Sequence, residues 1–180
     1  MANTNPTKVI TGKVRFSYCH VFEPAAVSEG SDDKKYSVSI IIDKGDKATL
    51  KKINDAIEAA KKLGIETKWG GKAPKNLKLP LRDGDLERDE ECYENTMFLS
   101  AKTDRKPGIV DANLDEIISR DEFYSGCYGR ASINFFPFDV NGSKGIAVGL
   151  QNLQKLEDGE RLGGSAATAA EDFGDEDDLS

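Results

Sequence analysis

The alternation of hydrophobic and polar positions predicts a chain made mostly of β-strands. Residues 9–18 alternate, so that Val14, Phe16 and Tyr18 share one side of a strand and are expected in the core. The same signal recurs in five further segments, which are residues 35–43, 96–102, 108–111, 128–140 and 144–156. Asn141-Gly142 separates the last two, and this pair is typical of a tight hairpin turn.

One segment has the periodicity of a helix. Hydrophobic residues recur at spacings of three and four from Leu50 to Leu63, which predicts an amphipathic helix packed on the sheet. Asp46 is suited to cap its first turn, and Gly64 is suited to end it. Residues 69–82 and the acidic residues 83–94 predict two long loops.

These elements predict a mostly β fold with one or two helices. Five strands with a helix inserted after the second or third fit an OB-fold-like Greek-key β-barrel with long loops. A β-sandwich is the alternative architecture, whereas a doubly wound α/β fold is excluded because βαβ alternation is absent. We expect one oligonucleotide-binding domain over residues 1–161, followed by a disordered, flexible acidic C-terminal tail over residues 162–180.

The net charge of -7 is distributed unevenly along the chain. Residues 1–82 contain 16 basic and 9 acidic residues, whereas residues 83–122 contain 5 basic and 13 acidic ones. Six further acids and no base lie in residues 162–180. The acidic total therefore conceals a basic N-terminal half, and it is local charge that meets the phosphates of a nucleic acid.

Several functional classes lack their signatures. Residues 1–7 have no apolar stretch typical of a secretion signal, and no apolar run is long enough to span a bilayer, so we expect a cytoplasmic protein with no membrane partner. Cys19, Cys92 and Cys127 are then expected to be reduced thiols, and their spacing does not fit a metal site. No nucleotide-binding or hydrolase motif occurs, so we expect no cofactor, no metal and no enzymatic activity.

Cations and aromatic side chains interleave along the predicted strands and loops. Sequence-independent binding of single-stranded DNA requires cations that follow the backbone and flat rings on which bases stack. The candidate DNA-binding residues are Lys13, Arg15, Lys34, Lys35, Trp69, Lys72, Phe98, Lys102, Arg105, Tyr128, Arg130 and Phe136.

The acidic tail is a second candidate site. A tethered polyanion can compete with DNA for a cationic groove, and when displaced it can bind replication or recombination proteins. The candidate residues are Asp172, Phe173, Asp175, Glu176, Asp177 and Asp178. A tail that merely keeps the protein soluble is the alternative interpretation.

Two other functions stay open at this point. The acids of residues 83–94 could bind Mg²⁺ in a metal-dependent nuclease, although contiguous acids in a loop are usually solvated. The exposed rings could instead serve a protein–protein adaptor with no affinity for nucleic acid. A homodimer is also left open.

Four segments carry a resemblance to a known family: PLRDGD at 80–85, KPGIVDAN at 106–113, YSGCYGRASINFF at 124–136 and KGIAVGLQNLQKLEDGERLGG at 144–164. Over residues 8–164 the chain resembles the bacteriophage single-stranded-DNA-binding proteins that were formerly a domain of unknown function. The resemblance implies an oligonucleotide-binding barrel with an acidic tail, and a role in coating single strands during phage DNA replication, recombination or repair. Other coating proteins often end on an aromatic residue, whereas this tail ends in Leu179-Ser180 and has its aromatic at Phe173.

Overall fold

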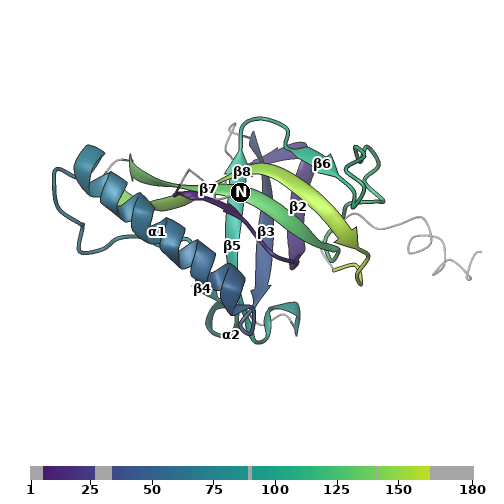
Figure 1. Ribbon diagram of the computed structural model, residues 1–180. Coiled ribbons are helices and arrows are strands. Elements are labelled where there is room, and N and C mark those ends of the chain that lie inside the picture. Colours follow the sequence, from purple (N-terminus) through teal and green to yellow (C-terminus); the bar gives the residue numbers. More distant parts are fainter. Residues whose placement is uncertain (1–5, 27–33, 89–90, 141, 163–180) are drawn as a thin grey trace, which may run out of the picture.

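Five strands close into a β-barrel in the computed structural model, which describes residues 6–26, 34–88, 91–140 and 142–162 (Figure 1). The barrel strands are β2 (Val14–Ala26), β3 (Lys34–Asp43), β5 (Thr96–Thr103), β7 (Tyr128–Val140) and β8 (Ser143–Glu157). Their order around the barrel is β7-β2-β3-β5-β8, and β8 returns to pair with β7. All neighbours are antiparallel except β5 and β8, which are parallel. This is the Greek-key barrel predicted from the sequence, and the sandwich alternative is wrong.

Short elements extend the barrel at its edges. β1 (Lys8–Ile10) pairs with β7, β4 (Arg82–Asp83) pairs with β5, and β6 (Gly108–Val110) pairs with β8. The segment predicted as an acidic loop contains α2 (Gly84–Glu87) and the 3₁₀ turn η1 (Glu91–Tyr93). These short elements lie beside β5 and cover part of its outer surface.

The long helix α1 (Lys47–Thr67) is inserted between β3 and β5, as predicted. Asp46 caps it, because its carboxylate accepts a hydrogen bond from the Thr49 N–H at 3.2 Å. The helix buries Ile53, Ala56, Ile57 and Ala60 against the barrel, chiefly along β7 (Figure 1).

Two expectations about the end of α1 are wrong. Leu63 is 43% exposed and lies off the buried face. Gly64 does not end the helix, which continues to Thr67; it is buried inside the helix because the Trp69 ring occupies the space where a side chain would lie.

The first strand also departs from simple alternation. The predicted strand over residues 9–18 is divided into β1 and β2, and β2 continues to Ala26 through shifts in its pairing with β3 between Ser17 and His20. Tyr18 lies at this irregularity with a φ of 47°, and its side chain is 44% exposed. Because a bulge changes which face a residue occupies, Tyr18 is not in the core as expected, while Val14 and Phe16 are.

Strand β7 shows the expected alternation most clearly. Gly129, Ala131, Ile133 and Phe135 are buried in the barrel, while the intervening side chains point outward. β7 pairs with β8 from Tyr128↔Glu157 to Val140↔Ser143, which confirms the predicted hairpin.

None of the described helices combines the length and hydrophobicity needed to cross a lipid bilayer.

Candidate nucleic-acid interface

A groove runs across the outer surface of β2, β3 and β5 and onto the β7–β8 hairpin. It consists of three adjoining hollows of about 750, 220 and 470 Å³. Tyr18 lines both the first and the second, and Arg88, Ser100 and Lys102 line both the second and the third. The hollows therefore form one path that narrows in the middle, which we call the groove.

The third hollow is the cationic part of the groove. It is lined by five basic side chains and by no carboxylate among the described residues; the bases are Lys35, Lys78, Arg82, Arg88 and Lys102. Phe98, Phe136 and Phe138 line the same hollow. Cations and rings thus meet on one surface, which is the combination that single-strand binding requires.

Arg88 was not predicted as a site residue, yet it lies at the centre of the groove. Its guanidinium is 5.0 Å from the Phe98 ring centroid, 5.6 Å from Tyr93 and 5.8 Å from Tyr18, so it contacts three aromatic rings. Its Nε is buried and has no hydrogen-bond partner within the described part of the chain. The sequence offers one signal for it, since Arg88 is the sole base among the acids of residues 83–94.

Tyr93 and Phe98 form the layer beneath Arg88. Their rings pack edge to face with centroids 5.0 Å apart, and both are buried together with Ile41. The Tyr93 hydroxyl shares a hydrogen bond with Ser39 at 3.1 Å, and burial raises the pKa of this phenol. This layer supports Arg88 from below and fixes the height of the groove floor.

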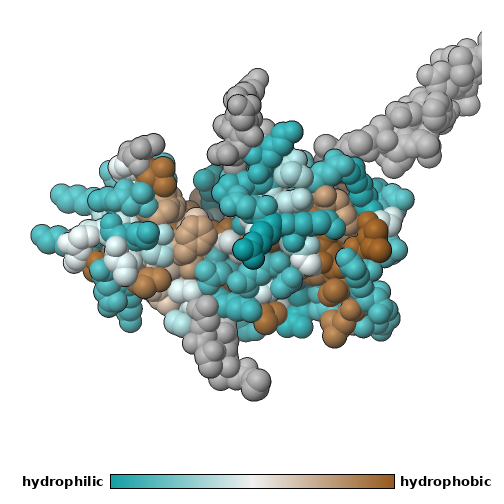
Figure 2. Space-filling view, turned by 90° about the horizontal axis from the view of Figure 1, so that it is seen from above, coloured by the Kyte–Doolittle hydropathy of each residue, from teal (hydrophilic) through white to brown (hydrophobic). Residues whose placement is uncertain are grey.

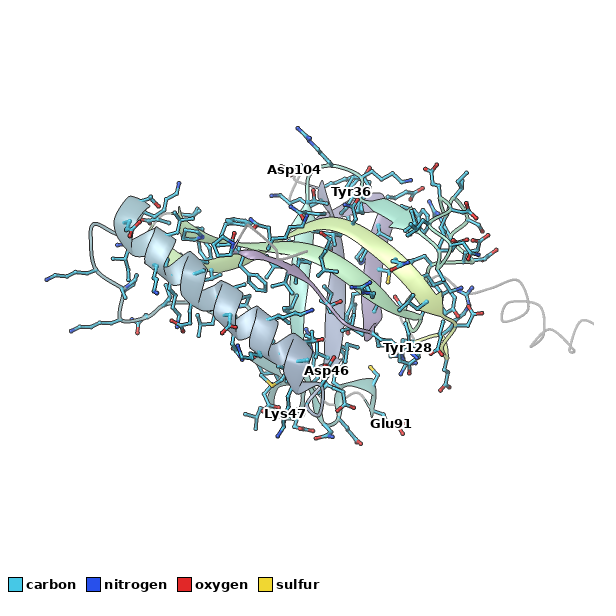
Figure 3. All side chains as sticks on the ribbon, viewed as in Figure 1. Tyr36, Asp46, Lys47, Glu91, Asp104 and Tyr128 are labelled. Atoms are coloured by element: carbon cyan, nitrogen blue, oxygen red, sulfur yellow. The ribbon has the colours of Figure 1, made fainter. Side chains whose placement is uncertain are left out.

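The first hollow, at the other end of the groove, has mixed charge. Lys13, Arg15 and Arg161 line it together with Asp43, Glu91, Glu94 and Glu160. Figure 3 shows Tyr128 and Glu91, two of its lining residues, at the same end of the barrel.

The cations near Tyr128 already have partners. Lys13 and Arg15 lie 5.4 and 5.2 Å from the centroid of its ring. Lys13 also forms an ion pair with Glu157. Arg15 donates to the Gly126 carbonyl at 3.0 Å and the Glu160 carbonyl at 2.8 Å, so it also holds together two chain segments at this end.

The predicted DNA-binding residues divide into three groups. Six of them line the groove with exposed or half-buried side chains: Lys13, Arg15, Lys35, Lys102, Tyr128 and Phe136. Four are exposed but lie outside its lining: Lys34, Lys72, Arg105 and Arg130. Arg130 instead donates from Nε to the Thr11 carbonyl at 3.0 Å. Of the two candidates on β7 nearest each other, Tyr128 therefore lines the groove and Arg130 does not.

The other two, Trp69 and Phe98, do not offer an open ring face. Trp69 is 5% exposed, because its ring packs against Gly64 and its Nε1 donates to the Phe138 carbonyl at 3.1 Å. Phe98 is 2% exposed, because Tyr93 and Arg88 cover it. Trp69 anchors its loop, and Phe98 belongs to the groove floor.

Three acids of residues 83–94 form ion pairs within the fold, which are Asp83 and Asp85 with Lys44 and Glu87 with Arg82, whereas Glu91 and Glu94 line the first hollow. Lys44 Nζ lies 2.9 Å from Asp83 Oδ1 and 2.6 Å from Asp85 Oδ2. The Lys44 hydrogen bond lowers the pKa of Asp83, and the hydrogen bond from the Asn95 N–H, together with Lys44, lowers the pKa of Asp85. Across the described residues, no three His, Cys, Asp or Glu side chains gather in a metal-binding group.

The three cysteines are free thiols, as expected. Burial raises the pKa of Cys19 to about 12 and also raises the pKa of Cys127. Both thiols stay protonated at neutral pH and are poor nucleophiles.

The predicted tail residues Asp172, Phe173, Asp175, Glu176, Asp177 and Asp178 lie outside the described residues. The structure does describe where the chain leaves the barrel. Glu160, Arg161 and Leu162 line the first hollow, and the Leu162 N–H donates to the Ser125 carbonyl at 3.0 Å. The segment that follows Leu162 therefore starts at the groove.

Comparisons with known proteins agree with this geometry. The model of the Enterobacter phage Enc34 ssDNA-binding protein family matches residues 7–180. Protein p50 of Acyrthosiphon pisum secondary endosymbiont phage 1 is 31% identical over 178 residues, which cover 93% of each chain.

Solved structures share the fold. The single-stranded DNA-binding protein of bacteriophage Enc34, solved in complex with ssDNA, superposes with a TM-score of 0.77 at 24% identity over 91% of this chain and 97% of that chain. The protein gp2.5 of bacteriophage T7, also a single-stranded DNA-binding protein, gives a TM-score of 0.61 at 16% identity over 94% of this chain and 93% of that one. The resemblance noted in the sequence is confirmed, and the chain belongs to the Enterobacter phage Enc34 ssDNA-binding protein family.

Proposed function

We propose that this protein binds single-stranded DNA along the groove without sequence preference, as a non-catalytic coating protein. It acts in phage DNA replication, recombination or repair in the cytoplasm of the infected cell, with residues 1–161 as the binding domain. Membership of the Enc34 ssDNA-binding protein family supports single-stranded DNA as the ligand. The observation that carries the proposal is the cationic hollow, which is lined by five bases, by Phe136 and Phe138 and by the buried floor residue Phe98, without a carboxylate among the described lining residues.

The groove suits a flexible backbone better than a base sequence. Lysine and arginine side chains contact phosphates, which every nucleotide carries, while rings accept any base by stacking. Phe136, 41% exposed, and Tyr18, 44% exposed, provide ring surface at the cationic hollow and at the narrow centre.

Arg88 is placed to bind the strand at the narrow centre. Arg88 lines both the narrow centre and the cationic hollow, so its guanidinium can donate a charge-assisted hydrogen bond to a phosphate oxygen or base carbonyl, a contact of about 1.5–3 kcal/mol. The aromatic layer restricts the guanidinium before DNA arrives, so little conformational entropy remains to be lost on binding.

The acidic tail competes with DNA for the groove and, once displaced, recruits replication or recombination proteins. Support comes from its starting point, because Leu162 lines the first hollow and places the following residues at high local concentration near the cations.

A titration of fluorescent oligo-dT at several salt concentrations tests the binding proposal. For single strands the slope of log K against log salt is about −0.7 for each neutralised phosphate, so contacts from three to five cations give a slope of about −2 to −3.5. Lys102→Ala should reduce the steepness of this slope by about 0.7. Lys51→Ala is the matched control, since Lys51 is exposed on α1 outside the groove lining.

Equal effects of the two substitutions would reject the groove as the binding surface, and absence of oligo-dT binding would reject the function. The nuclease alternative is tested in the same material, by incubating labelled single strands with Mg²⁺ or Mn²⁺. A coating protein leaves the strands intact.

A further inference from the structure

One end of the molecule carries a basic surface. We call residues 68–81 the basic connection; it links α1 to β4 and contains no acid. Its exposed lysines are Lys68, Lys72, Lys75 and Lys78. Trp69 fixes it to β7, and the Lys78 N–H donates to the Lys144 carbonyl at 3.0 Å. Lys72 and Lys75 form no ion pair with any described residue, so their charges are available to another molecule.

A second surface, the acidic connection, is formed by residues 111–122 between β6 and β7. It contains five acids, which are Asp111, Asp115, Glu116, Asp121 and Glu122, and one base, Arg120, which pairs with Glu23. Asp115 and Glu116 are exposed and have no ion-pair partner among the described residues.

The acidic connection holds two large apolar side chains in solvent. Leu114 is 71% exposed and Ile118 is 77% exposed. Asp111 Oδ1 accepts from the N–H groups of Asn113 at 2.8 Å and Asp115 at 3.0 Å, so the turn that presents Leu114 is braced from inside. Leu114 has a φ of 69°, a conformation that a non-glycine residue adopts at a cost. Exposed apolar groups on a braced, strained turn are typical of a contact surface.

The two surfaces lie at opposite ends of the molecule. Figure 1 shows the chain between α1 and β4 at one end and the chain between β6 and β7 at the other, and Figure 2 shows exposed hydrophobic surface at the latter end. The groove connects them. Lys78, Leu79 and Pro80 of the basic connection line its cationic hollow, while Arg161 in the first hollow lies 3.7 Å from Asp121 of the acidic connection.

We propose that the acidic connection of one protomer docks on the basic connection of the next copy of this chain along the same DNA strand. The contact is head to tail, because the two surfaces differ and lie at opposite ends. A repeated contact between unlike surfaces builds an open array instead of a closed dimer. Such an array places the first hollow of one copy beside the cationic hollow of the next, so one strand passes from groove to groove.

Charge complementarity favours a second copy of this chain as the partner that binds the acidic connection. The acidic connection requires a partner with several cations that are not already paired, and the basic connection supplies them on the same chain. Leu79, which is 45% exposed within the basic connection, provides an apolar partner for Leu114 or Ile118. The proposal rests on the proposed function, since it concerns copies bound to one strand.

The test compares a long single strand with the shortest oligo-dT that saturates one protomer, using the full chain. Four variants are needed: Asp115→Lys with Glu116→Lys, Lys72→Glu with Lys75→Glu, these four charge substitutions together, and Leu114→Ser with Ile118→Ser. All six side chains are exposed, so folding should be retained, and a thermal melt checks this.

We expect wild-type protein to bind each site on the long strand on the order of tenfold more tightly than the short oligomer, as a few surface ion pairs and an apolar contact allow. Each pair of substitutions should abolish this difference in affinity. The variant with Asp115→Lys and Glu116→Lys should still bind the short oligomer as tightly as the wild type does. The fourfold variant should restore it, because the charges are exchanged on both sides of every contact.

Three results would overturn the inference. The first is equal affinity of the wild-type protein for long and short strands. The second is a pair variant that loses the tighter binding to the long strand when the fourfold variant does not regain it, and the third is a Leu114→Ser with Ile118→Ser variant that keeps this tighter binding. Each differs from failure of the proposed function, in which the short oligomer itself is not bound. If Lys72→Glu with Lys75→Glu weakened the short oligomer as much as the long strand, the basic connection would be a DNA contact instead.

Discussion

The indole ring of Trp69 lies over the backbone of Gly64, so close that a Cβ added to the glycine would be 2.6 Å from the ring. The same Cβ would be 2.8 Å from the Cβ of Pro137 in β7. Gly64 is thus the point at which α1, the basic connection and the barrel wall meet. The missing side chain allows all three to approach.

Gly64→Ala should destabilise the protein although alanine is the better helix former. Helix propensity favours alanine by up to about 1 kcal/mol, whereas overpacking costs about 1–3 kcal/mol. We expect a net loss and a melting temperature lower by a few degrees, measured by thermal denaturation. Gly149→Ala is the matched control, since its Cβ would have ordinary contacts at 3.6 Å and beyond. A melting temperature at or above that of the wild type would contradict this packing.

Arg88→Met should weaken the binding of short oligo-dT about tenfold, as expected when one charge-assisted hydrogen bond is lost. Methionine keeps an apolar stem over Phe98 and removes the charge, so the salt dependence should also become shallower. Arg120→Met is the control, because Arg120 pairs with Glu23 away from the groove. If both variants bound equally well, Arg88 would have only a structural role beneath the strand.

Removal of residues 163–180 should tighten oligo-dT binding at low salt. The six acids of this segment no longer compete for the groove, and the advantage should shrink as salt screens the competition. Fluorescence anisotropy on the full and shortened chains measures it. A shortened protein that binds no better than the full chain would leave the tail with a solubilising role.

Low pH should break the ion pairs that Lys44 forms with Asp83 and Asp85. The pKa values of Asp83 and Asp85 are lowered below 3.8 in the folded protein, so their contribution is present above that pH and is lost as pH falls through the lowered values. The stability difference between wild type and Lys44→Met should be constant from pH 5 to 7 and shrink below about pH 4. Urea midpoints measure it, and Lys68→Met, an exposed lysine of the basic connection, is the control. A difference that does not shrink at any pH below 4 would contradict the assignment.

The elements that pair locally could be predicted from the sequence. Alternation along residues 128–140 placed Ile133 and Phe135 in the barrel and Phe136 outside, because strand geometry alone decides the face. The Asn141-Gly142 turn identified the hairpin partner. The helix was recognised from its period, and only its last turn was misplaced, because the space at Gly64 is taken by a residue five positions later.

Contacts between distant segments could not be predicted in this way. Tyr18 leaves the core through a bulge that depends on its pairing with β3, and Phe98 is buried because η1 brings Tyr93 over it. Arg88 reaches the groove only because α2 folds back along β5. Composition shows that rings and cations are present, but which of them is covered depends on the tertiary fold.

The two faces of strand β7 make different contacts. Pro137 meets the helix at Gly64, while its neighbours Phe136 and Phe138 line the cationic hollow. Variation at residues 136–138 is therefore constrained twice, once by stability and once by ligand affinity. The solvent face of α1, where Lys51 is exposed, takes part in neither contact, so substitutions there are expected to change stability and ligand affinity little.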